Sequence, residues 1–323
     1  MTQNAMLSLV PRLSIGLPVY NGESFLEETL DGMRRQTYGN FELIISDNAS
    51  TDRTEQICRQ YASEDRRIRY VRQDRNLGAV ANFNHVFSLG NAPFFKWIAH
   101  DDAYDPRYLD TVMAIIETDP DVVLAHTAVR FIDETGKEFA RDDARGGYAG
   151  PWDSAYRYPD STTIGDSPSA RDRFRQVLIG ALWGTHMFGV IRRDALARTE
   201  LLANFVSSDR AMLAELALMG RFRAAKERYF KKRFHADVSW ALSQKELKTK
   251  LSTGDVAYSR RLRQLKAFLS APWNKPVNLP TKIACTGLVL AHSLRTVREI
   301  MASKDAHNEA IAKEWHKPDR DAA

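Results

Sequence analysis

The sequence predicts an α/β protein with a mostly parallel β-sheet flanked by helices and followed by a helical C-terminal extension. Two observations predict this architecture. Strand-like apolar runs alternate with segments of helical spacing up to about residue 133, which is the order expected when crossover helices cover a parallel sheet. From residue 241 onward the sequence is richer in Lys and Arg, keeps helical spacing and shows no strong strand.

The alternating elements lie in the first half of the chain. Strands are expected at 13–20, 41–47, 68–73, 92–100 and 122–133. Helices are expected at 24–36, 51–61 and 78–89, and another opens with Asp105 as N-cap and Pro106 in the first helical position. Short apolar runs bounded by Asn, Gly, Pro and Asp are typical of buried strands.

The second half is less regular. Residues 134–172 are rich in Gly, Pro, Asp, Ser and Tyr, which predicts a long loop with little regular structure. Residues 181–193 resume a strand-like pattern, and 207–219 predict an amphipathic helix with Ser and Asp caps. We therefore expect one α/β domain in residues 1–240 and a basic helical region in residues 241–323.

Composition narrows the class of protein. The chain has 323 residues, a formal charge of +5 and a pI of about 9.1, which fit a solvated basic surface or attraction to anionic phosphates or lipid headgroups. Cys58 and Cys285 lie far apart and show no metal-ligand spacing, which argues against a disulfide framework and a zinc site. The N-terminus lacks the pattern of a signal peptide, and the longest apolar stretch, 283–294, is too short to span a bilayer. We expect a cytoplasmic protein, at most peripheral at the inner face of a membrane.

Polar side chains follow three of the predicted strands. They are Tyr20 and Asn21, Asp47 and Asn48, and Asp101 and Asp102. Because ligands of open α/β sheets bind beyond the carboxyl ends of the strands, we expect these side chains to share one cleft.

The acidic residues suit two kinds of contact. Asp101 and Asp102 could hold a hard divalent cation, Mn²⁺ or Mg²⁺, that neutralises a diphosphate, although helix capping and loop solvation explain such residues equally well. Asp47 could accept the ring N–H of a base, or could start an Asx turn. Tyr20 could stack on a base or ribose, although packing is the commoner role, and Asn76 is a turn residue that could face the same crevice.

These clusters together resemble the inverting glycosyltransferase family 2, with the GT-A fold, over about residues 13–230. The resemblance rests on the stretches LPVYNGES and SDNASTDRT within 13–54, RNLGAVANFN at 75–84 and KWIAHDDAYDPRYL at 96–109. The chain lacks the Gln-x-x-Arg-Trp motif of processive members, and Ser208 stands where many members have a second acidic residue. A non-processive enzyme is therefore implied.

The resemblance assigns roles residue by residue. It implies nucleoside contacts for Pro18, Tyr20 and Glu23, base reading by Asp47, and an acidic metal motif at Asp101 and Asp102, with Asp102 favoured as the direct ligand. It implies that His235 can reach the metal or the diphosphate, that Asp209 is the general base, and that Trp183 and His186 lie near the acceptor. From the residues alone, Asp209 is also a good helix start, Trp183 a core residue and His235 a surface or packing residue.

The resulting hypothesis is a metal-dependent transferase that moves a sugar from a UDP-, GDP- or dTDP-linked donor to a hydroxyl of a glycan or lipid-linked acceptor in bacterial cell-surface polysaccharide assembly. The alternatives are a nucleotidyltransferase that makes nucleotide sugars, whose Gly-rich phosphate loop is missing after the first strand, and a non-catalytic nucleotide-sugar binding protein. No nucleic-acid partner is expected. The basic C-terminal segments could pack on the domain, form a homodimer or lie on an anionic membrane.

Overall fold

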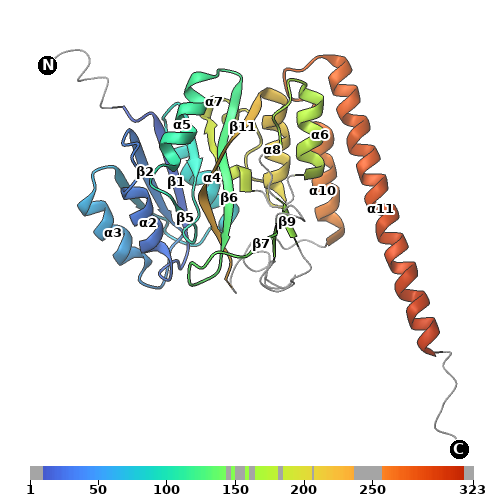
Figure 1. Ribbon diagram of the computed structural model, residues 1–323, viewed down its shortest axis with the longest axis horizontal. Coiled ribbons are helices and arrows are strands. Elements are labelled where there is room, and N and C mark those ends of the chain that lie inside the picture. The colour runs from blue at the N-terminus through green and yellow to red at the C-terminus, as the bar shows by residue number, and fades with distance from the viewer. Residues whose placement is uncertain are drawn as a thin grey trace, which may run out of the picture.

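The computed structural model describes residues 10–142, 147–149, 157–159, 164–180, 185–205, 207–235 and 257–315. Its centre is an eight-stranded sheet in the order β3-β2-β1-β4-β10-β6-β11-β5, with helices on both faces (Figure 1). A three-stranded sheet, β7-β8-β9, lies beside it. The predicted α/β architecture with a C-terminal helical extension is confirmed.

The first half forms the elements expected from its pattern. The strands are β1 (Leu13–Val19), β2 (Phe41–Asp47), β3 (Ile68–Arg72), β4 (Phe94–Trp97) and β6 (Val122–Ile132). The helices are α2 (Leu26–Arg34), α3 (Thr54–Glu64), α4 (Ala79–Leu89) and α5 (Tyr108–Thr118). Every residue of β1 is buried, which explains why its sequence is a continuous apolar run without alternation.

Strand pairing in the sheet is mostly parallel. Strands β1, β2, β3 and β4 pair in parallel, as do β6 and β11 (Arg221–Arg233). The short strand β10 (Val190–Arg192) lies antiparallel between β4 and β6, and β5 (Ala103–Tyr104) pairs antiparallel with β11. Since β5 follows the acidic pair directly, this last pairing places the end of β11 beside Asp101 and Asp102.

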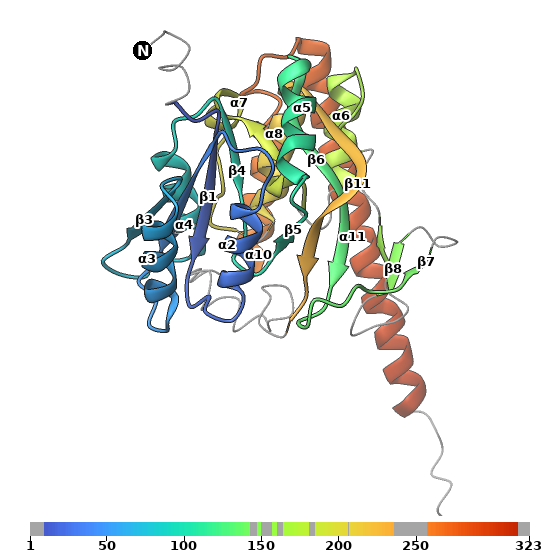
Figure 2. The ribbon, with the colours of Figure 1, turned by 60° about the vertical axis from the view of Figure 1, so that its left-hand side comes forward.

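Two apolar cores cover the two faces of the sheet. On one face, α2, α3 and α5 bury Leu26, Ile57 and Leu109. On the other face, α4, α6 (Ala170–Gly180) and α8 (Ser208–Met219) bury a second cluster that includes Val86 and Leu213. Figures 1 and 2 show these helix layers on either side of the strands.

Several local predictions are corrected. The expected loop 134–172 contains β7 (Arg141–Asp142), β8 (Gly147–Ala149), β9 (Arg157–Pro159) and the start of α6. In place of a strand over 181–193 there are a 3₁₀ turn, η3 (Thr185–Phe188), then β10 and α7 (Arg193–Ala197); residues 181–184 lie outside the described residues. These pieces are too short for a periodic pattern to reveal.

Two predicted helix starts also differ. Asp105 is not the N-cap of α5, because the helix begins at Tyr108 with Arg107 as its N-cap, and the Asp105 carboxylate accepts a hydrogen bond from the Arg107 N–H in the turn before the helix. Helix α8 begins after Ser207, which has a left-handed φ of 65° and makes no side-chain capping bond. Helix α8 is buried on nearly all sides rather than amphipathic, because it lies between the sheet and the C-terminal helices.

The C-terminal helices share the second core. Helix α10 (Ala257–Ser270) and helix α11 (Leu279–Trp315) contribute Phe268, Cys285 and Val289 to the cluster that contains α6 and α8. The ammonium of Lys275 lies 2.6 Å from the carboxylate of Glu215 on α8, and both side chains are buried. The described helices thus pack on the α/β layer, whereas the predicted boundary near residue 240 falls outside the described residues and stays a prediction.

Two further sequence observations can be compared with the structure. Cys58 and Cys285 are both buried and free, in agreement with the absence of a disulfide framework. Within the described part of the chain, no helix has the length and apolar character needed to cross a membrane.

Candidate active site

The predicted polar residues at the strand ends lie along the carboxyl edge of the sheet. Strand register aligns Val19 at the end of β1 with Asp47 at the end of β2, and Asp47 with Arg72 at the end of β3. At the other side of this edge, Arg233 at the end of β11 is paired with Ile132 at the end of β6. Side chains that are far apart in sequence therefore end at one edge, as the parallel topology requires.

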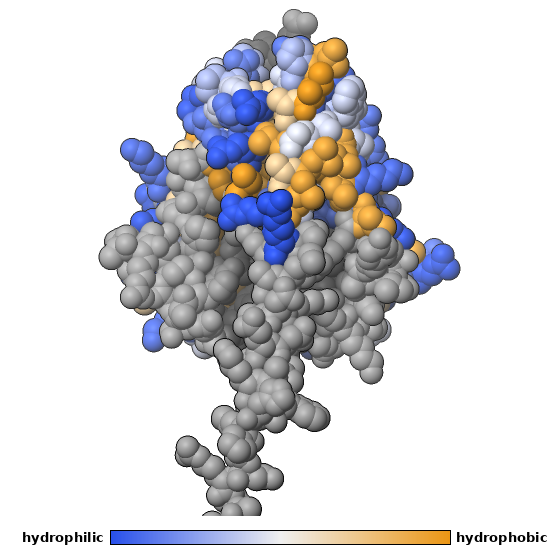
Figure 3. Space-filling model, turned by 90° about the vertical axis from the view of Figure 1, so that its right-hand side faces the viewer, coloured by the Kyte–Doolittle hydropathy of each residue, from blue (hydrophilic) through white to orange (hydrophobic). Residues whose placement is uncertain are grey.

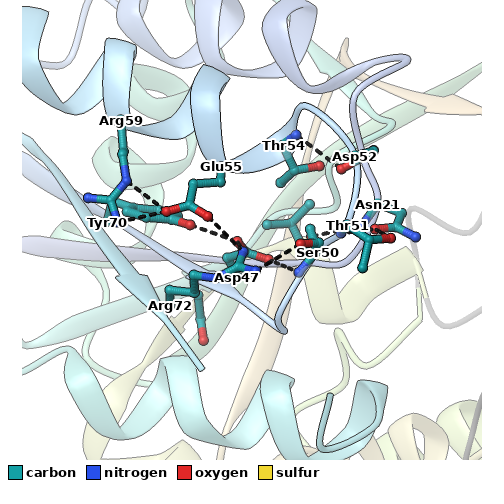
Figure 4. Close-up of polar contacts among 12 residues, drawn as sticks. Asn21, Asp47, Ser50, Thr51, Asp52, Thr54, Glu55, Arg59, Tyr70 and Arg72 are labelled. Atoms are coloured by element: carbon teal, nitrogen blue, oxygen red, sulfur yellow. Dashed lines mark hydrogen bonds and ion pairs between the residues drawn. The ribbon is translucent and has the colours of Figure 1, made fainter. Parts of the chain in front are cut away.

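Asp47 forms the centre of a hydrogen-bonded group that we call the nucleoside-side cluster, consisting of Asp47, Ser50, Glu55, Tyr70 and Arg72 (Figure 4). Its fully buried carboxylate accepts hydrogen bonds from the Tyr70 hydroxyl at 2.7 Å, the Arg72 guanidinium at 2.6 Å and the Ser50 N–H at 2.8 Å. The Arg72 guanidinium also lies 3.3 Å from Glu55. Asp47 therefore orients Arg72 and the following loop.

The loops after β1 and β2 are tied together. The N–H of Asn21 donates to the Ser50 hydroxyl at 2.9 Å, and the N–H of Thr51 donates to the Asn21 side-chain oxygen at 2.8 Å (Figure 4). Asn21 and Ala49 have left-handed φ values of 50° and 61°. Asn tolerates this conformation, whereas it is strained for Ala. The loops are thus fixed against each other, at some conformational cost at Ala49.

A shallow depression of about 320 Å³ lies next to this cluster, lined by Gln73, Asp74, Arg75 and Leu77. Between these lining residues, the side-chain oxygen of Asn76 accepts hydrogen bonds from the Asn48 amide and the Gly78 N–H, each at 2.8 Å. The structure thus gives Asn76 the turn role.

The other predicted nucleoside contacts differ in exposure. Tyr20 is 44% exposed, Pro18 is buried, and Glu23 is exposed and accepts a hydrogen bond from the N–H of Arg53. Tyr20 is therefore the side chain among these three whose apolar surface is available for stacking.

Asp101 and Asp102 form hydrogen bonds with residues near the end of β11. Asp102 has no exposed side-chain surface, and its two oxygens accept hydrogen bonds from the Lys232 ammonium and the Arg233 N–H, each at 3.1 Å. Asp101 accepts a hydrogen bond from the Nε2 of His235 at 3.0 Å, and each of these two side chains is 12% exposed. Adjacent carboxylates are thus placed differently: Asp102 faces the protein interior, and Asp101 lies nearer the surface with His235.

Charges around the pair explain the ionisation of both carboxylates. Burial opposes ionisation of Asp101, but the Lys232 ammonium and the His235 hydrogen bond outweigh it and hold the pKa of Asp101 below its ordinary value. Burial raises the pKa of Asp102, against the attraction of Lys232 and with the repulsion of Asp101 adding to the effect. Asp101 therefore stays charged to a lower pH than Asp102 does.

The donors near Asp101 fit a divalent cation that also binds a diphosphate. A carboxylate and an imidazole from two different elements are suitable ligands for Mn²⁺ and acceptable for Mg²⁺ with added waters. Among the described residues, no group of three or more Cys, His, Asp or Glu side chains could hold a metal ion. A cation here would therefore take its remaining ligands from water and the diphosphate. Each oxygen of Asp102 already accepts a hydrogen bond and its side chain has no exposed surface, which favours Asp101 over Asp102 as the direct ligand.

The backbone around Asp101 and Asp102 is closely packed against α2 and the loop before it. A Cβ atom added to Gly22 would lie 2.8 Å from the His100 ring and 2.7 Å from the Val19 side chain. The Thr29 hydroxyl is 2.9 Å from the backbone oxygen of His100 and 2.8 Å from that of Asp102. Helix α2 and its preceding loop thus fix the backbone that carries the acidic pair.

Asp209 reaches the same edge through the topology of α8 and β11. Strand β11 begins opposite Val122 at the amino edge of β6, and α8 ends directly before it at Met219. A helix of 12 residues is about 18 Å long, so its first turn, with Asp209, lies toward the carboxyl edge. Burial raises the pKa of Asp209, and the N–H and charge of Arg210 counteract this in part. A less acidic carboxylate is a stronger proton acceptor.

Of the two predicted acceptor residues, His186 is described, and it does not lie at the surface. His186 is 2% exposed, and its ring lies 4.8 Å, centroid to centroid, from that of His126. Lys96 is fully buried nearby and contacts the rings of Tyr104 and Tyr108. Trp183 lies outside the described residues, so its predicted role stays a prediction.

Sequence reasoning missed Tyr70, Arg72, Lys232 and Arg233. The guanidinium of Arg233 is buried, donates to the backbone oxygen of Asp101 at 2.9 Å and also contacts Glu28 of α2. The basic run KKRF before His235 was the available signal. Its members could not be ranked because only strand pairing decides which of them faces the acidic pair.

Comparisons with known proteins agree with this geometry. The sequence profile of "Glycosyl transferase family 2" matches residues 14–198. EpsE of Bacillus subtilis, which carries a glycosyltransferase assignment, is 33% identical over 132 residues, 41% of this chain and 48% of EpsE. The chain spans less than half the length of such curated relatives.

Two solved structures share the fold. TarS of S. aureus in complex with UDP-GlcNAc superposes with a TM-score of 0.59 at 15% identity, covering 86% of this chain and 71% of TarS. The mannosyltransferase PcManGT of Pyrobaculum calidifontis, in complex with GDP-Man and Mn²⁺, gives a TM-score of 0.51 at 16% identity, covering 90% of this chain and 80% of PcManGT. With the profile match extending over more than half of its length, this chain belongs to glycosyl transferase family 2 and has the GT-A fold.

Proposed function

We propose that this protein transfers a sugar from a nucleoside-diphosphate sugar to an acceptor hydroxyl with inversion at the anomeric carbon. The observation that supports this most strongly is the shared edge, where the nucleoside-side cluster, the Asp101–His235 pair and Asp209 all end. These three groups correspond to the three parts of such a reaction: nucleoside, diphosphate and attacking hydroxyl.

The nucleoside binds in the depression beside Arg72. Tyr20 offers its exposed ring for stacking, and the walls between Gln73 and Leu77 hold the base. Asp47 acts through Arg72 and the Ser50 loop, because its own oxygens are already engaged. UDP-GlcNAc in TarS and GDP-Man in PcManGT support a nucleoside diphosphate as the class of donor.

Asp101 and His235 hold a divalent cation, Mn²⁺ or Mg²⁺, which supplies charge neutralisation to the leaving diphosphate. The Mn²⁺ in the PcManGT complex supports this assignment. Lys232 and Arg233 keep Asp102 in place, and Asp102 in turn holds the end of β11 against the acidic pair.

Asp209 removes the proton from the acceptor hydroxyl. As this oxygen attacks the anomeric carbon from the side opposite the diphosphate, the new C–O bond forms and the bond from the anomeric carbon to the phosphate oxygen breaks. The bonding electrons leave with the nucleoside diphosphate, and the proton stays on Asp209 until solvent takes it up. The raised pKa of Asp209 suits this role.

A donor panel tests the proposal. The purified protein is mixed with Mn²⁺ or Mg²⁺ and with UDP-, GDP- and dTDP-sugars, and binding and slow donor hydrolysis are measured. We expect one donor to bind only when a cation is present. Formation of a nucleotide sugar from a sugar phosphate and a nucleoside triphosphate would instead indicate a nucleotidyltransferase, and binding without hydrolysis or transfer would indicate a binding protein.

The role of Asp209 needs its own variant. Asp209→Asn keeps the size of the side chain and removes the base, so donor affinity should stay within about twofold while transfer to an acceptor falls by roughly 100-fold or more. Asp194→Asn is the matched control, since that carboxylate is 80% exposed on α7. Transfer by Asp209→Asn at the rate of the unmodified protein would remove Asp209 from the mechanism.

The acceptor is a glycan or lipid-linked saccharide of a bacterial cell surface. This narrower proposal rests on the family resemblance of the sequence, and Trp183, which was predicted to lie near the acceptor, is outside the described residues.

A further inference from the structure

The outward face of α11 is apolar over four turns. From Leu279 to Leu294, the exposed positions of the helix carry no charged residue. They are Leu279, Pro280, Ile283, Gly287, Leu290, Ala291 and Leu294. Four of them are large side chains with 49% to 61% of their surface exposed. A soluble surface helix normally shows charged or polar residues on this side.

The opposite side of α11 is already packed. Cys285 and Val289 are buried in the core shared with α6 and α8. Leu279, Ile283, Leu290 and Leu294 therefore do not belong to the core of this domain, and we call them the α11 ridge. Figure 3 shows the apolar surface gathered on this face of the molecule, with hydrophilic residues beside it.

The charge of the surrounding segment indicates which kind of partner binds the ridge. Between residues 256 and 298 the chain contains eight Lys and Arg residues and no Asp or Glu. They are Arg260, Arg261, Arg263, Lys266, Lys275, Lys282, Arg295 and Arg298. Among those that are described, Arg295 and Arg298 are exposed at the end of the ridge, and Lys282 lies beside it. The Lys275 ammonium is neutralised by the buried carboxylate of Glu215.

This one-sided charge disfavours a second copy of the chain. In a two-fold dimer the same face meets itself, so the basic residues of both copies would approach without any acidic partner from this segment. An anionic lipid surface supplies the opposite charge and accepts the leucines and isoleucine at the same time.

Trp273 adds a side chain suited to a membrane interface. Its ring is 50% exposed, its indole N–H donates to the Thr286 hydroxyl at 3.1 Å, and the Lys282 ammonium lies 5.9 Å from the ring centroid. The ring is thus held at the side of α11 with its apolar surface outward. Such amphipathic rings favour the boundary between headgroups and acyl chains.

We infer that the α11 ridge and its flanking basic residues bind the surface of a membrane rich in anionic lipids. In Figures 1 and 2, α11 runs toward and past the edge of the sheet at which β1 and β11 end. The ridge forms the first part of α11, which lies beside the sheet before the helix passes that edge.

Vesicle flotation tests this inference with the full chain. The protein is mixed with vesicles of phosphatidylcholine alone, or with about one third phosphatidylglycerol. Binding to the anionic vesicles should exceed binding to neutral ones by roughly tenfold and should weaken between low and high salt. Failure of the unmodified protein to float with anionic vesicles at low salt overturns the inference.

Two sets of substitutions separate the contribution of the apolar side chains to membrane binding from that of the basic side chains. Leu290→Glu with Leu294→Glu should weaken binding to anionic vesicles by roughly 100-fold or more, because two apolar side chains are lost from the contact. Val10→Glu is the matched control, since Val10 is 65% exposed before β1 and its substitution should leave binding nearly unchanged. Arg295→Gln with Arg298→Gln should lower the preference for anionic over neutral vesicles.

Unfolding is excluded by thermal melts of each variant, which should match the unmodified protein because all four positions are exposed. Light scattering after gel filtration then tests whether a second copy of the chain binds the ridge instead. A dimer that the two leucine substitutions convert to a monomer, together with no binding to vesicles, would assign the ridge to a second copy and overturn the membrane inference.

Discussion

Asp47 and Asp101 end at the same edge of the sheet, but their surroundings differ. Asp47 is fully buried, and its carboxylate accepts hydrogen bonds from Tyr70 and Arg72 of β3 and from the Ser50 N–H in the loop after β2. The Asp101 side chain is 12% exposed and shares its position with His235 from the end of β11. The first carboxylate is part of the scaffold of the proposed nucleoside pocket, and the second can still accept a ligand. The two aspartates differ in the exposure of the side chain and in the number of hydrogen-bond donors to it, although both lie at the carboxyl end of a strand.

The largest effects should come from the adjacent pair. Asp101→Asn should remove cation-dependent nucleotide binding and lower kcat/KM by at least roughly 100-fold, with little change in stability, because a surface-facing ligand is lost. Asp102→Asn should instead lower the free energy of unfolding by about 3 kcal/mol, because it leaves the Lys232 ammonium near the interior without its closest partner. Calorimetric titration with Mn²⁺ and urea denaturation distinguish the two outcomes. If Asp102→Asn loses cation binding while keeping its stability, Asp102 is the ligand after all.

The nucleoside-side cluster should respond through Arg72. Arg72→Met removes one of three donors to the buried Asp47 carboxylate and should lower the free energy of unfolding by about 2 kcal/mol, with weaker donor binding. Arg59→Met is the matched control, because Arg59 also contacts Glu55, at 2.7 Å, but is 63% exposed and should change stability by less than about 0.5 kcal/mol. Equal effects of the two substitutions in urea denaturation would mean that Asp47 does not depend on Arg72.

His126 extends this comparison to a buried group that, among the described residues, forms no ion pair with an acid. Burial, together with the neighbouring His186 and Lys96, lowers the pKa of His126 to about 3. The folded state therefore resists protonation of His126 while the unfolded chain takes up the proton below about pH 6.5. The contribution of His126 to stability is complete above that pH and is lost as the pH falls, by roughly 2 kcal/mol at pH 5.

Urea denaturation at pH 7 and pH 5 measures this loss. His126→Phe should remove that part of the pH dependence while keeping an aromatic ring against His186. A variant that loses as much stability between the two pH values as the unmodified protein would show that other groups cause the acid sensitivity.

The smallest expected effect is at the loop between β2 and α3. Ala49 has a left-handed φ of 61°, so Ala49→Gly relieves strain but adds freedom to the unfolded chain. We expect a net gain of about 0.5 kcal/mol in the free energy of unfolding. A melting temperature that falls in Ala49→Gly would indicate that the side chain makes a contact that offsets the strain.

Sequence periodicity was sufficient to predict the strands and helices of the first half of the chain. The five strands and their helices form where continuous apolar runs and helical spacing place them, because burial on both faces of β1 and its neighbours leaves a strong local pattern. The edge at which Asp47 and Asp101 lie follows from parallel order alone. Short elements such as η3 and β8 carry no such pattern and were missed.

The sequence by itself determined the α/β class, the family resemblance and the set of acidic residues at the strand ends. Only the tertiary structure decided which acid is open, because Lys232 and Arg233 reach Asp102 from a strand that is more than 100 positions away. It also decided which face of α11 stays exposed, because the burial of Cys285 and Val289 against α6 and α8 turns Ile283, Leu290 and Leu294 outward. Pairing between distant strands and packing between distant helices depend on contacts that no local pattern in the chain encodes.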